Sequence, residues 1–395
     1  MEHRYTYADR AEFFRPSPVR SVWDVSMQPG MISFAGGNPD LSILPLDELG
    51  KAAQRIITER GTDALQYGAG AGLPSLRTKF TELMESGGVH DIDADDVMVT
   101  PGSQMGINLT TTLLCNPHDV ILAEGPTYVG AIGSFLGHEA DIRHVMCDDD
   151  GLVPEALIEA IQKARADGKR IAFLYTIPNF SNPTGIRLSV ERRQQIVEIC
   201  RTEGVQIVED DPYGILSFDG TMLPSMRSMD DSVIYLGSVS KIFSPGLRIG
   251  WTVAPPEFHQ RMLLASEASA LMAGVLSQEL TYEYLEHMDW RTHVQSGISR
   301  YKARAEALVA GLEETMPEGV TWTTPKGGFF TWLTLPEGTD SDEVLAKAIE
   351  KKVVFISGPG FFADGQGKRN LRLSYSRVSE DDIREGTSRL AEVLS

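Results

Sequence analysis

The stretch that decides the fold of this 395-residue chain is Val233–Trp251, which reads VIYLGSVSKIFSPGLRIGW. Its first four residues, Val233–Leu236, are apolar or aromatic and predict a short buried strand. The mostly small residues of Gly237–Ser240 leave room for a group to lie close to the backbone. Lys241 follows at once, and Arg248 comes seven residues later, where a second strand pattern begins. A lysine in this setting is poorly explained as a surface residue, although most lysines are solvated.

The side chains around this lysine indicate a particular chemistry. Schiff-base formation with a carbonyl uses such an amine, and pyridoxal phosphate is its common partner. The amine attacks only when it is deprotonated, so burial and a nearby cation that lower the pKa of Lys241 would help. The hydroxyls of Ser238 and Ser240 and the guanidinium of Arg248 suit a phosphate group, because arginine offers a planar fork of donors.

Length and composition exclude several classes of protein. A chain of 395 residues is too long for one small core, so we expect a large domain and a smaller one. The net charge of −19 and the absence of a basic run disfavour nucleic-acid binding. No stretch has the apolar length of a membrane span or of a signal peptide. Three scattered cysteines without metal-ligand spacing predict a reducing, cytoplasmic setting and no metal site.

From residue 95 onward, strand and helix patterns alternate, which is typical of a parallel sheet with crossover helices. The predicted strands are Val97–Thr100, Val120–Glu124, Ala140–Val145, Arg170–Tyr175, Val205–Val208 and Val233–Leu236. A long helical region is expected over Pro256–Met288, and an α+β pattern follows it. We therefore expect an N-terminal arm with part of the small domain over 1–50, a large domain over 51–290 and a small domain over 291–395.

A turn of small residues at the end of the first predicted strand could bind a phosphate. Gly102, Ser103 and Gln104 lead from this strand into a helix. The free N–H groups and the dipole at a helix N-terminus favour an anion. This turn would complete one phosphate site with Lys241 and Arg248.

These motifs together resemble those of fold-type I pyridoxal-phosphate enzymes. The sequence SVSKIFSPGLRIGW is similar to the lysine motif of class I aminotransferases, above all the kynurenine/2-aminoadipate aminotransferases. The resemblance runs over nearly the whole chain. It implies an aspartate aminotransferase-like α/β fold, in which helices flank a mostly parallel seven-stranded sheet and a smaller α+β domain is attached. It also implies pyridoxal 5′-phosphate as the cofactor, bound at Lys241, and a homodimer.

The resemblance assigns further cofactor contacts. By the family's D-x-x-Y spacing, Asp210 faces the ring nitrogen and Tyr213 bonds the phenolic O3′; Asp211 is the alternative carboxylate, since strand alternation sends only one of the two inward. Asn182 of the Asn-Pro-Thr-Gly motif also donates to O3′. Tyr128 matches the family's stacking position, although a tyrosine in the core would look the same.

Substrate contacts also follow from the resemblance. Arg372, in the context N-L-R-x-S-x-S, corresponds to the arginine that binds the substrate carboxylate, while a solvated edge arginine is the plainer alternative. Arg20 and the glycine segment at Gly37 correspond to substrate-lining positions, and Asn182 lies on the substrate side. Tyr67 matches a tyrosine that reaches the phosphate of the neighbouring subunit, although a packed tyrosine in a glycine turn fits the residues equally well.

The predicted function is a ping-pong transamination. An L-α-amino acid with an aromatic, branched or 2-aminoadipate-like side chain would donate its amino group to a 2-oxo acid such as 2-oxoglutarate or pyruvate. Lys241 would move the proton between Cα and the cofactor's C4′. Another reaction of the same cofactor (β-elimination, decarboxylation or racemisation) is the main alternative. A non-enzymatic sensor of the same fold is the other, although the fifty residues before the large domain are too short for the DNA-binding module of such regulators.

Overall fold

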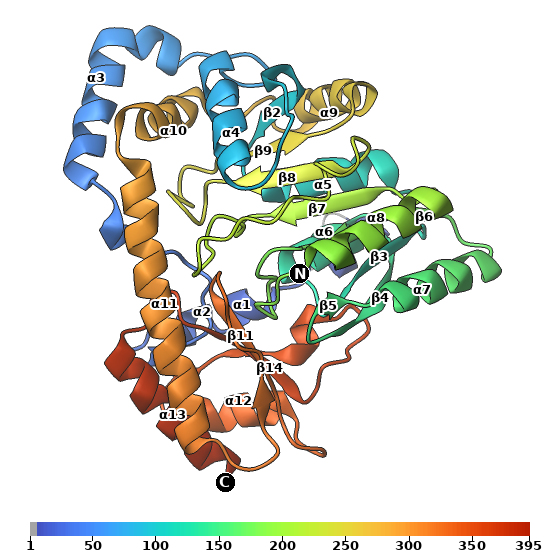
Figure 1. Cartoon of the computed structure of the whole chain (residues 1–395), viewed down its shortest axis with the longest axis vertical. Helices are drawn as coiled ribbons and strands as arrows, with labels where there is room; N and C mark the ends of the chain where they lie inside the picture. The colour runs from blue at the N-terminus through green and yellow to red at the C-terminus, as the bar shows by residue number, and fades with distance from the viewer. Residues whose placement is uncertain (1–5) are drawn as a thin grey trace.

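The computed structural model describes residues 6–395 and is built around a large central sheet (Figure 1). Its strand order is β2-β9-β8-β7-β6-β3-β4-β5. The strands are β2 Val97–Thr100, β3 Val120–Gly125, β4 Asp141–Asp148, β5 Gly151–Leu152, β6 Ile171–Thr176, β7 Ile207–Asp211, β8 Ile234–Ser238 and β9 Gly250–Val253. Adjacent strands in the run β8-β7-β6-β3-β4 are parallel to one another. By contrast, β9 is antiparallel to both β8 and β2. The predicted mostly parallel sheet is confirmed.

The sheet has eight strands rather than the predicted seven. The additional strand, β5, has two residues and pairs antiparallel with the end of β4. The chain reverses there because the Asp148 side chain accepts a hydrogen bond from the Asp150 N–H at 2.9 Å, which closes a tight turn.

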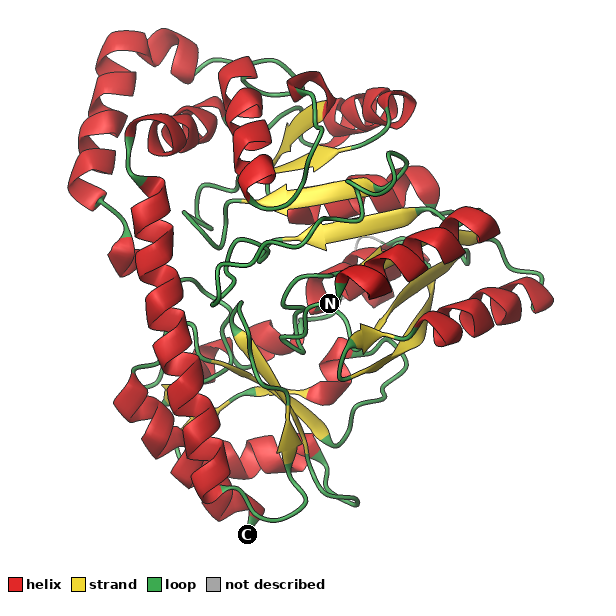
Figure 2. Ribbon diagram, viewed as in Figure 1, coloured by secondary structure: helices red, strands yellow, loops and turns green. Residues whose placement is uncertain are grey.

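Helices cover both faces of this sheet (Figure 2). Ile121 of β3 packs with α5 and α6, whereas Val120 and Leu122 pack with α7 and α8. This alternation is the two-residue period of a strand that is buried on both sides. The helices around the sheet are α3 Leu46–Ala64, α4 Pro74–Ser86, α5 Ser103–Leu114, α6 Val129–Gly137, α7 Pro154–Ala166, α8 Val190–Glu203, α9 Pro256–Ser269 and α10 Val275–His287. The expected long helix over Pro256–Met288 is thus two helices, and Leu271 between them has a φ of 61°.

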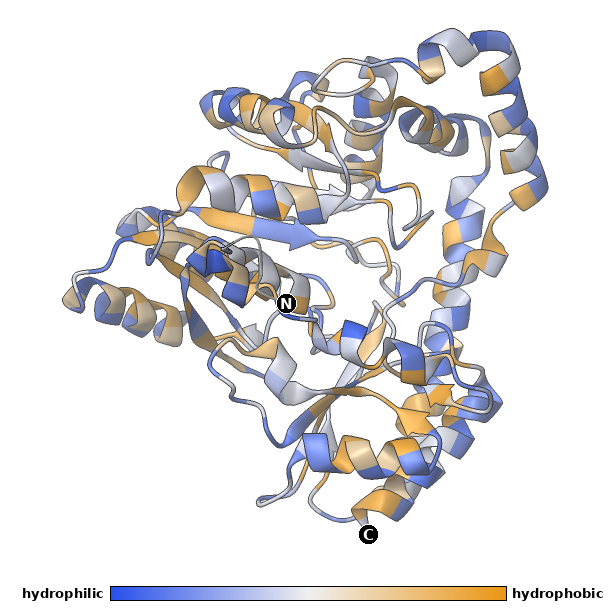
Figure 3. Cartoon of the chain, turned by 180° about the vertical axis from the view of Figure 1, so that it is seen from behind, coloured by the Kyte–Doolittle hydropathy of each residue, from blue (hydrophilic) through white to orange (hydrophobic). Residues whose placement is uncertain are grey.

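The C-terminal residues form a second, smaller sheet. It is antiparallel with the order β10-β11-β14-β13, made of Thr321–Trp322, Phe330–Thr334, Asn370–Ser374 and Ile356–Ser357. The helices α11 Trp290–Thr315, α12 Ser341–Glu350 and α13 Glu380–Leu394 pack around it, and α11 extends up beside the upper part of the chain (Figure 1). Viewed from behind, the helices alternate between polar and apolar residues, as expected when one face packs inward (Figure 3).

The N-terminal arm joins this smaller part of the molecule. Its elements are the short helices α1 Pro18–Ser21 and α2 Trp23–Ser26 and the strand β1 Ile32–Ser33, which pairs parallel with β12 Val353–Val354. Residues 1–5 of the predicted arm lie outside the described residues. Among residues 6–395, no helix is both long and apolar enough to cross a bilayer.

The parallel strands of the large sheet end at one edge, where ligands bind in open α/β sheets. The sequence predicted that β7 would end at Val208. The strand instead continues through Asp210 and Asp211, which pair with Leu236 and Gly237 of β8. The two acidic residues are therefore held rigidly, with side chains on opposite faces.

Candidate active site

A cavity of about 360 Å³ lies at this edge and brings together most of the predicted site residues. Those that line it are Gly37, Ser103, Gln104, Tyr128, Asn182, Asp210, Tyr213, Ser238, Ser240, Lys241, Arg248 and Arg372. They come from the arm, from the ends of several strands of the large sheet and from β14 of the small sheet. Residues far apart in sequence thus converge on one site.

Lys241 stands three residues after β8 and is half-buried. Its Nζ donates a hydrogen bond to the Gly37 carbonyl at 2.9 Å. The ring centroids of Tyr213 and Phe329 each lie 5.9 Å from this nitrogen. Burial, reinforced by the positive charges of Arg372 and Arg248, lowers the pKa of Lys241 to about 8. Roughly a tenth of the amine is therefore neutral at pH 7, which is the form that attacks a carbonyl.

Asp210 lines the same cavity and has one unsatisfied carboxylate oxygen. Its Oδ2 accepts a hydrogen bond from the Tyr175 hydroxyl at 2.6 Å, and its buried Oδ1 has no partner within residues 6–395. Burial raises the pKa of Asp210 to about 7. A buried carboxylate oxygen without a donor is costly, so this atom calls for a cationic N–H from a ligand.

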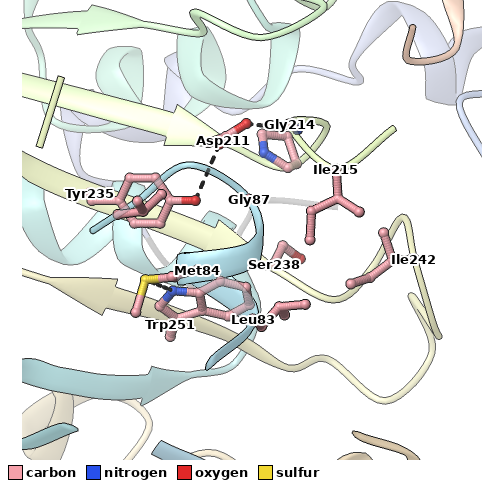
Figure 4. Close-up of a pocket in the computed structure, with 12 residues that line it drawn as sticks. Leu83, Met84, Gly87, Asp211, Gly214, Ile215, Tyr235, Ser238, Ile242 and Trp251 are labelled. Carbon is pink, nitrogen blue, oxygen red and sulfur yellow. Dashed lines mark hydrogen bonds between the residues drawn. The ribbon is translucent and has the colours of Figure 1, made fainter. Parts of the chain in front are cut away.

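Asp211 faces the opposite side of the sheet, where it lines a separate small cavity (Figure 4). It accepts hydrogen bonds from the Gly214 N–H at 2.9 Å and the Tyr235 hydroxyl at 3.3 Å. Through these bonds, the Asp211 side chain stabilises the turn that carries Tyr213. Of the two candidate carboxylates, Asp210 alone lines the Lys241 cavity.

An anion cradle lies where α5 begins. Gly102, the N-cap of α5, has a φ of 79°, and a Cβ on it would lie 2.3 Å from Nη2 of Arg248. Only glycine therefore lets this guanidinium lie against the start of the helix. Arg248 donates to the carbonyls of Pro245 and Pro101 at 3.2 and 3.4 Å and keeps further donors free. Ser103 and Gln104 are the first two residues of α5, so their N–H groups have no intrahelical acceptor and, beside this cation, suit a phosphate.

Arg372 is the second cation of the cavity and is 2 % exposed. It donates to Asn182 Oδ1 at 2.7 Å and to the Ala35 carbonyl, and it lies 4.3 Å from the Phe330 ring centroid. Its Nε has no partner within residues 6–395, and the two groups that accept from its Nη atoms are neutral. Burial lowers the pKa of Arg372 to about 10. The alternative of a solvated edge arginine is wrong, and the free buried cation indicates an acidic ligand.

Two tyrosines line the cavity beside these charges. Tyr213 packs edge-on against Phe329 and Phe330, with ring centroids 5.6 and 5.9 Å away. Tyr128 directly precedes α6. A Cβ on Gly130 would lie 2.4 Å from the Tyr128 ring, so the glycine allows this ring to lie against the first turn of the helix. Burial raises the pKa of both phenols, so they remain neutral at physiological pH.

Three predicted residues do not line the cavity of their own chain, and one of them, Gly102, directly precedes the lining residue Ser103. Arg20 is exposed on α1, and its neighbours Ser17 and Val19 line the cavity instead. Tyr67 is 77 % exposed in the loop between α3 and α4. Sequence reasoning also missed Tyr175, the hydrogen-bond donor to Asp210. Both residues lie near the ends of predicted strands, but only the pairing of β6 with β7 in the structure brings them together.

The donor set fits pyridoxal phosphate. The cradle at Gly102 and Arg248 suits a phosphate, the free Oδ1 of Asp210 suits a protonated ring nitrogen, and the readily deprotonated amine of Lys241 suits an aldehyde. No group of three or more potential metal ligands is found within residues 6–395.

The model of the family "Aminotransferase class I and II" matches residues 29–390. The chain belongs to this family. Among relatives of this aminotransferase, the aromatic-amino-acid aminotransferase 1 of Thermococcus litoralis is 35% identical over 396 residues, covering 100% of this chain and 95% of the relative.

Solved structures of aminotransferases superpose closely on this one. The kynurenine aminotransferase of Pyrococcus horikoshii, solved with PMP, KYN and KYA, has a TM-score of 0.92 at 35% identity and covers 98% of this chain and 96% of its own. The α-aminoadipate aminotransferase of Thermus thermophilus, complexed with N-(5′-phosphopyridoxyl)-L-leucine, has a TM-score of 0.90 at 33% identity and covers 98% and 97%. This aminotransferase has the fold-type I architecture, and its cofactor is pyridoxal 5′-phosphate. It transfers amino groups of amino acids.

Proposed function

We propose that this aminotransferase takes the amino group of an L-α-amino acid with a large side chain, aromatic, branched or 2-aminoadipate-like, and passes it to 2-oxoglutarate or a similar 2-oxo acid. The observation that carries the proposal is Arg372, a buried guanidinium in the Lys241 cavity whose hydrogen-bond acceptors within residues 6–395, Asn182 and the Ala35 carbonyl, are neutral. A bidentate pair with a carboxylate would satisfy it. The names of the relatives favour these side-chain classes.

When bound, pyridoxal phosphate supplies an aldehyde that takes up the amino group and a conjugated ring that accepts electrons from Cα. Lys241 acts as general base and acid for the proton at Cα, for which a pKa of about 8 is well suited. Arg372 and Asn182 bind and orient the substrate carboxylate.

The other residues of the cavity hold the cofactor. Asp210, oriented by the Tyr175 hydroxyl, keeps the ring nitrogen protonated. Tyr213 and Asn182 hydrogen-bond the phenolic oxygen, and Tyr128 covers the ring. The phosphate is bound by the residues of the cradle and its two serines, which are Gly102, Ser103, Gln104, Ser238, Ser240 and Arg248.

A panel of amino donors tests the substrate proposal. With 2-oxoglutarate as acceptor, we expect glutamate from aromatic and 2-aminoadipate donors, with kcat/KM about tenfold or more above that for alanine, because a large side chain buries more apolar area. Glutamate and the donor-derived oxo acid would be measured together. Release of carbon dioxide, an eliminated side chain or a racemised donor without glutamate would contradict transamination as the main reaction.

We also propose a homodimer in which Tyr67 serves the cavity of the partner subunit. The Tyr67 side chain does not line the cavity of its own chain. Leu65, Leu264 and Leu271 are each more than half exposed, and the Tyr67 loop lies against α9, since Cβ of Gly70 would be 3.8 Å from Leu263. Large apolar side chains exposed on neighbouring segments are typical of an interface.

Mixing two impaired variants tests the shared site. Lys241→Ala and Tyr67→Ala should each lose most activity alone. After unfolding and refolding together, random dimers should regain about a quarter of the parent activity, because half of the dimers carry one intact site of two. Refolding each variant alone is the control. Mixtures no more active than the sum of the two variants would contradict the exchange of Tyr67.

We propose a cytoplasmic location because the cysteines are unpaired. Cys115, Cys147 and Cys200 are all free thiols. Unpaired cysteines are typical of a reducing compartment.

A further inference from the structure

A buried glutamate lies beneath the loop that carries Asn182. Glu124, near the end of β3, is 4 % exposed. Its Oε1 accepts hydrogen bonds from the Thr176 hydroxyl and, at 3.3 Å, from the Ile177 N–H. Its Oε2 accepts from the Ser181 hydroxyl at 3.3 Å. All three donors belong to the end of β6 and the loop that follows it.

This loop is strained and needs support from its surroundings. Phe180 has a φ of 50°, which is unfavourable for a side chain of this size, and it is fully buried. Asn179 is held from a second side, since its Oδ1 accepts from Arg193 at 2.6 Å and its amide bonds Asp211. The loop is therefore fixed between two buried acidic residues, Glu124 and Asp211.

What the loop carries is the contact to Arg372. Asn182 directly follows Ser181, and its Oδ1 accepts from Arg372 Nη1 at 2.7 Å. Ile177, the other loop residue bound to Glu124, lines the Lys241 cavity. A displacement of this loop would thus move the group that orients the buried guanidinium.

We propose that Glu124 is a positioning residue for substrate recognition, which holds Asn182 and, through it, Arg372 in the orientation that binds the substrate carboxylate. The inference rests on the proposed function of Arg372. A buried carboxylate costs more free energy than an apolar side chain of the same size unless donors surround it. Here the donors are those of the loop, so the carboxylate orders the loop rather than simply filling space.

Glu209 provides a matched control. It is also a fully buried glutamate, on β7, and burial raises the pKa of each of these two glutamates to about 7. Its partners are the N–H groups of Met226 and Arg227, which do not line the cavity. Removal of the Glu209 carboxylate should lower the stability of the protein without changing the orientation of Arg372.

The test compares steady-state kinetics, thermal unfolding and amide hydrogen exchange of the holoenzymes. Glu124→Ala should raise KM for both the amino donor and the 2-oxo acid about tenfold, with a smaller change in kcat, because the carboxylate contact is made in the ground state as well. Exchange at residues 177–186 should become faster. Glu124→Gln should restore KM to within about threefold, since an amide can accept from Thr176 and Ile177 and donate to Ser181.

The control separates positioning from folding. Glu209→Ala should lower the unfolding temperature comparably but leave KM within about twofold. If Glu124→Ala does not fold, Ser181→Ala removes a single donor and should raise KM about threefold. Unchanged KM values in the Glu124 and Ser181 variants, or an equal KM increase in Glu209→Ala, would overturn the proposal. A parent enzyme without transaminase activity would instead refute the proposed function, and loop exchange would still report on Glu124.

Discussion

Lys241→Ala is expected to lower turnover by a factor of about 10⁴ or more, because the variant lacks both the amine that holds the cofactor and the base for the Cα proton. The protein should still fold and bind some cofactor, since the phosphate cradle at Gly102 and Arg248 is intact. The measurement is single-turnover and steady-state transamination, with the visible spectrum recorded alongside. Retention of more than a few percent of the parent rate would contradict the role of this amine.

The lowered pKa of Lys241 adds a pH dependence to this prediction. In the parent apoenzyme, the rate of cofactor capture should rise about tenfold per pH unit below pH 8 and level off above it, because only the neutral amine reacts. Lys241→Arg, which keeps the charge but does not deprotonate, is the matched control and should show no such rise. A rate that stays flat from pH 6 to 8 in the parent would count against a readily deprotonated lysine at this position.

Asp210→Asn is expected to lower kcat by a factor of about 10²–10³, since the amide cannot stabilise positive charge on the ring nitrogen. The hydrogen bond from Tyr175 can persist, because the amide oxygen still accepts it. A loss of activity with the Tyr175 contact retained therefore reports on the free oxygen of Asp210. A kcat within about threefold of the parent value would contradict the placement of Asp210 beside the ring nitrogen.

Although Asp210→Asn is expected to lower kcat of the holoenzyme, it should raise the thermal stability of the apoenzyme. Burial raises the folded-state pKa of Asp210 to about 7, so its proton is retained in the folded state and lost from the unfolded state over pH 4 to 7. Stability from this group falls as pH rises through that window. The apoenzyme of Asp210→Asn should therefore unfold at a higher temperature than the parent, with a gain that grows from about pH 4 to 7. Calorimetry over this range measures it, and a gain independent of pH would contradict the burial of a charged carboxylate.

The motifs predicted much of the site because each one combines a strand end with its turn. Val97–Thr100 with Gly102, and Val233–Leu236 with Lys241, are local patterns, and parallel strands bring their ends to one edge. The separation of Asp210 from Asp211 follows from strand alternation. Which of the two faces the cavity depends on the register of β7 against Leu236 and Gly237 of β8, and no local sequence pattern reveals that register.

Contacts between distant segments could not be predicted in the same way. The Tyr175–Asp210 bond and the three donors around Glu124 depend on how neighbouring strands and one loop pack. The burial of Arg372 depends on β14 lying inside the small sheet, where its alternating pattern looks the same as that of an edge strand. Tyr67 and Arg20 lie away from the cavity of their own chain, and their roles stay predictions.

Peptide mapping after borohydride reduction of the holoenzyme tests the central claim most directly, because reduction fixes the cofactor to the side chain that holds it. We expect a single phosphopyridoxyl group on the peptide that contains Lys241, and none on the same peptide of Lys241→Ala. Attachment at a different lysine, or no attachment in a coloured and active enzyme, would contradict the account.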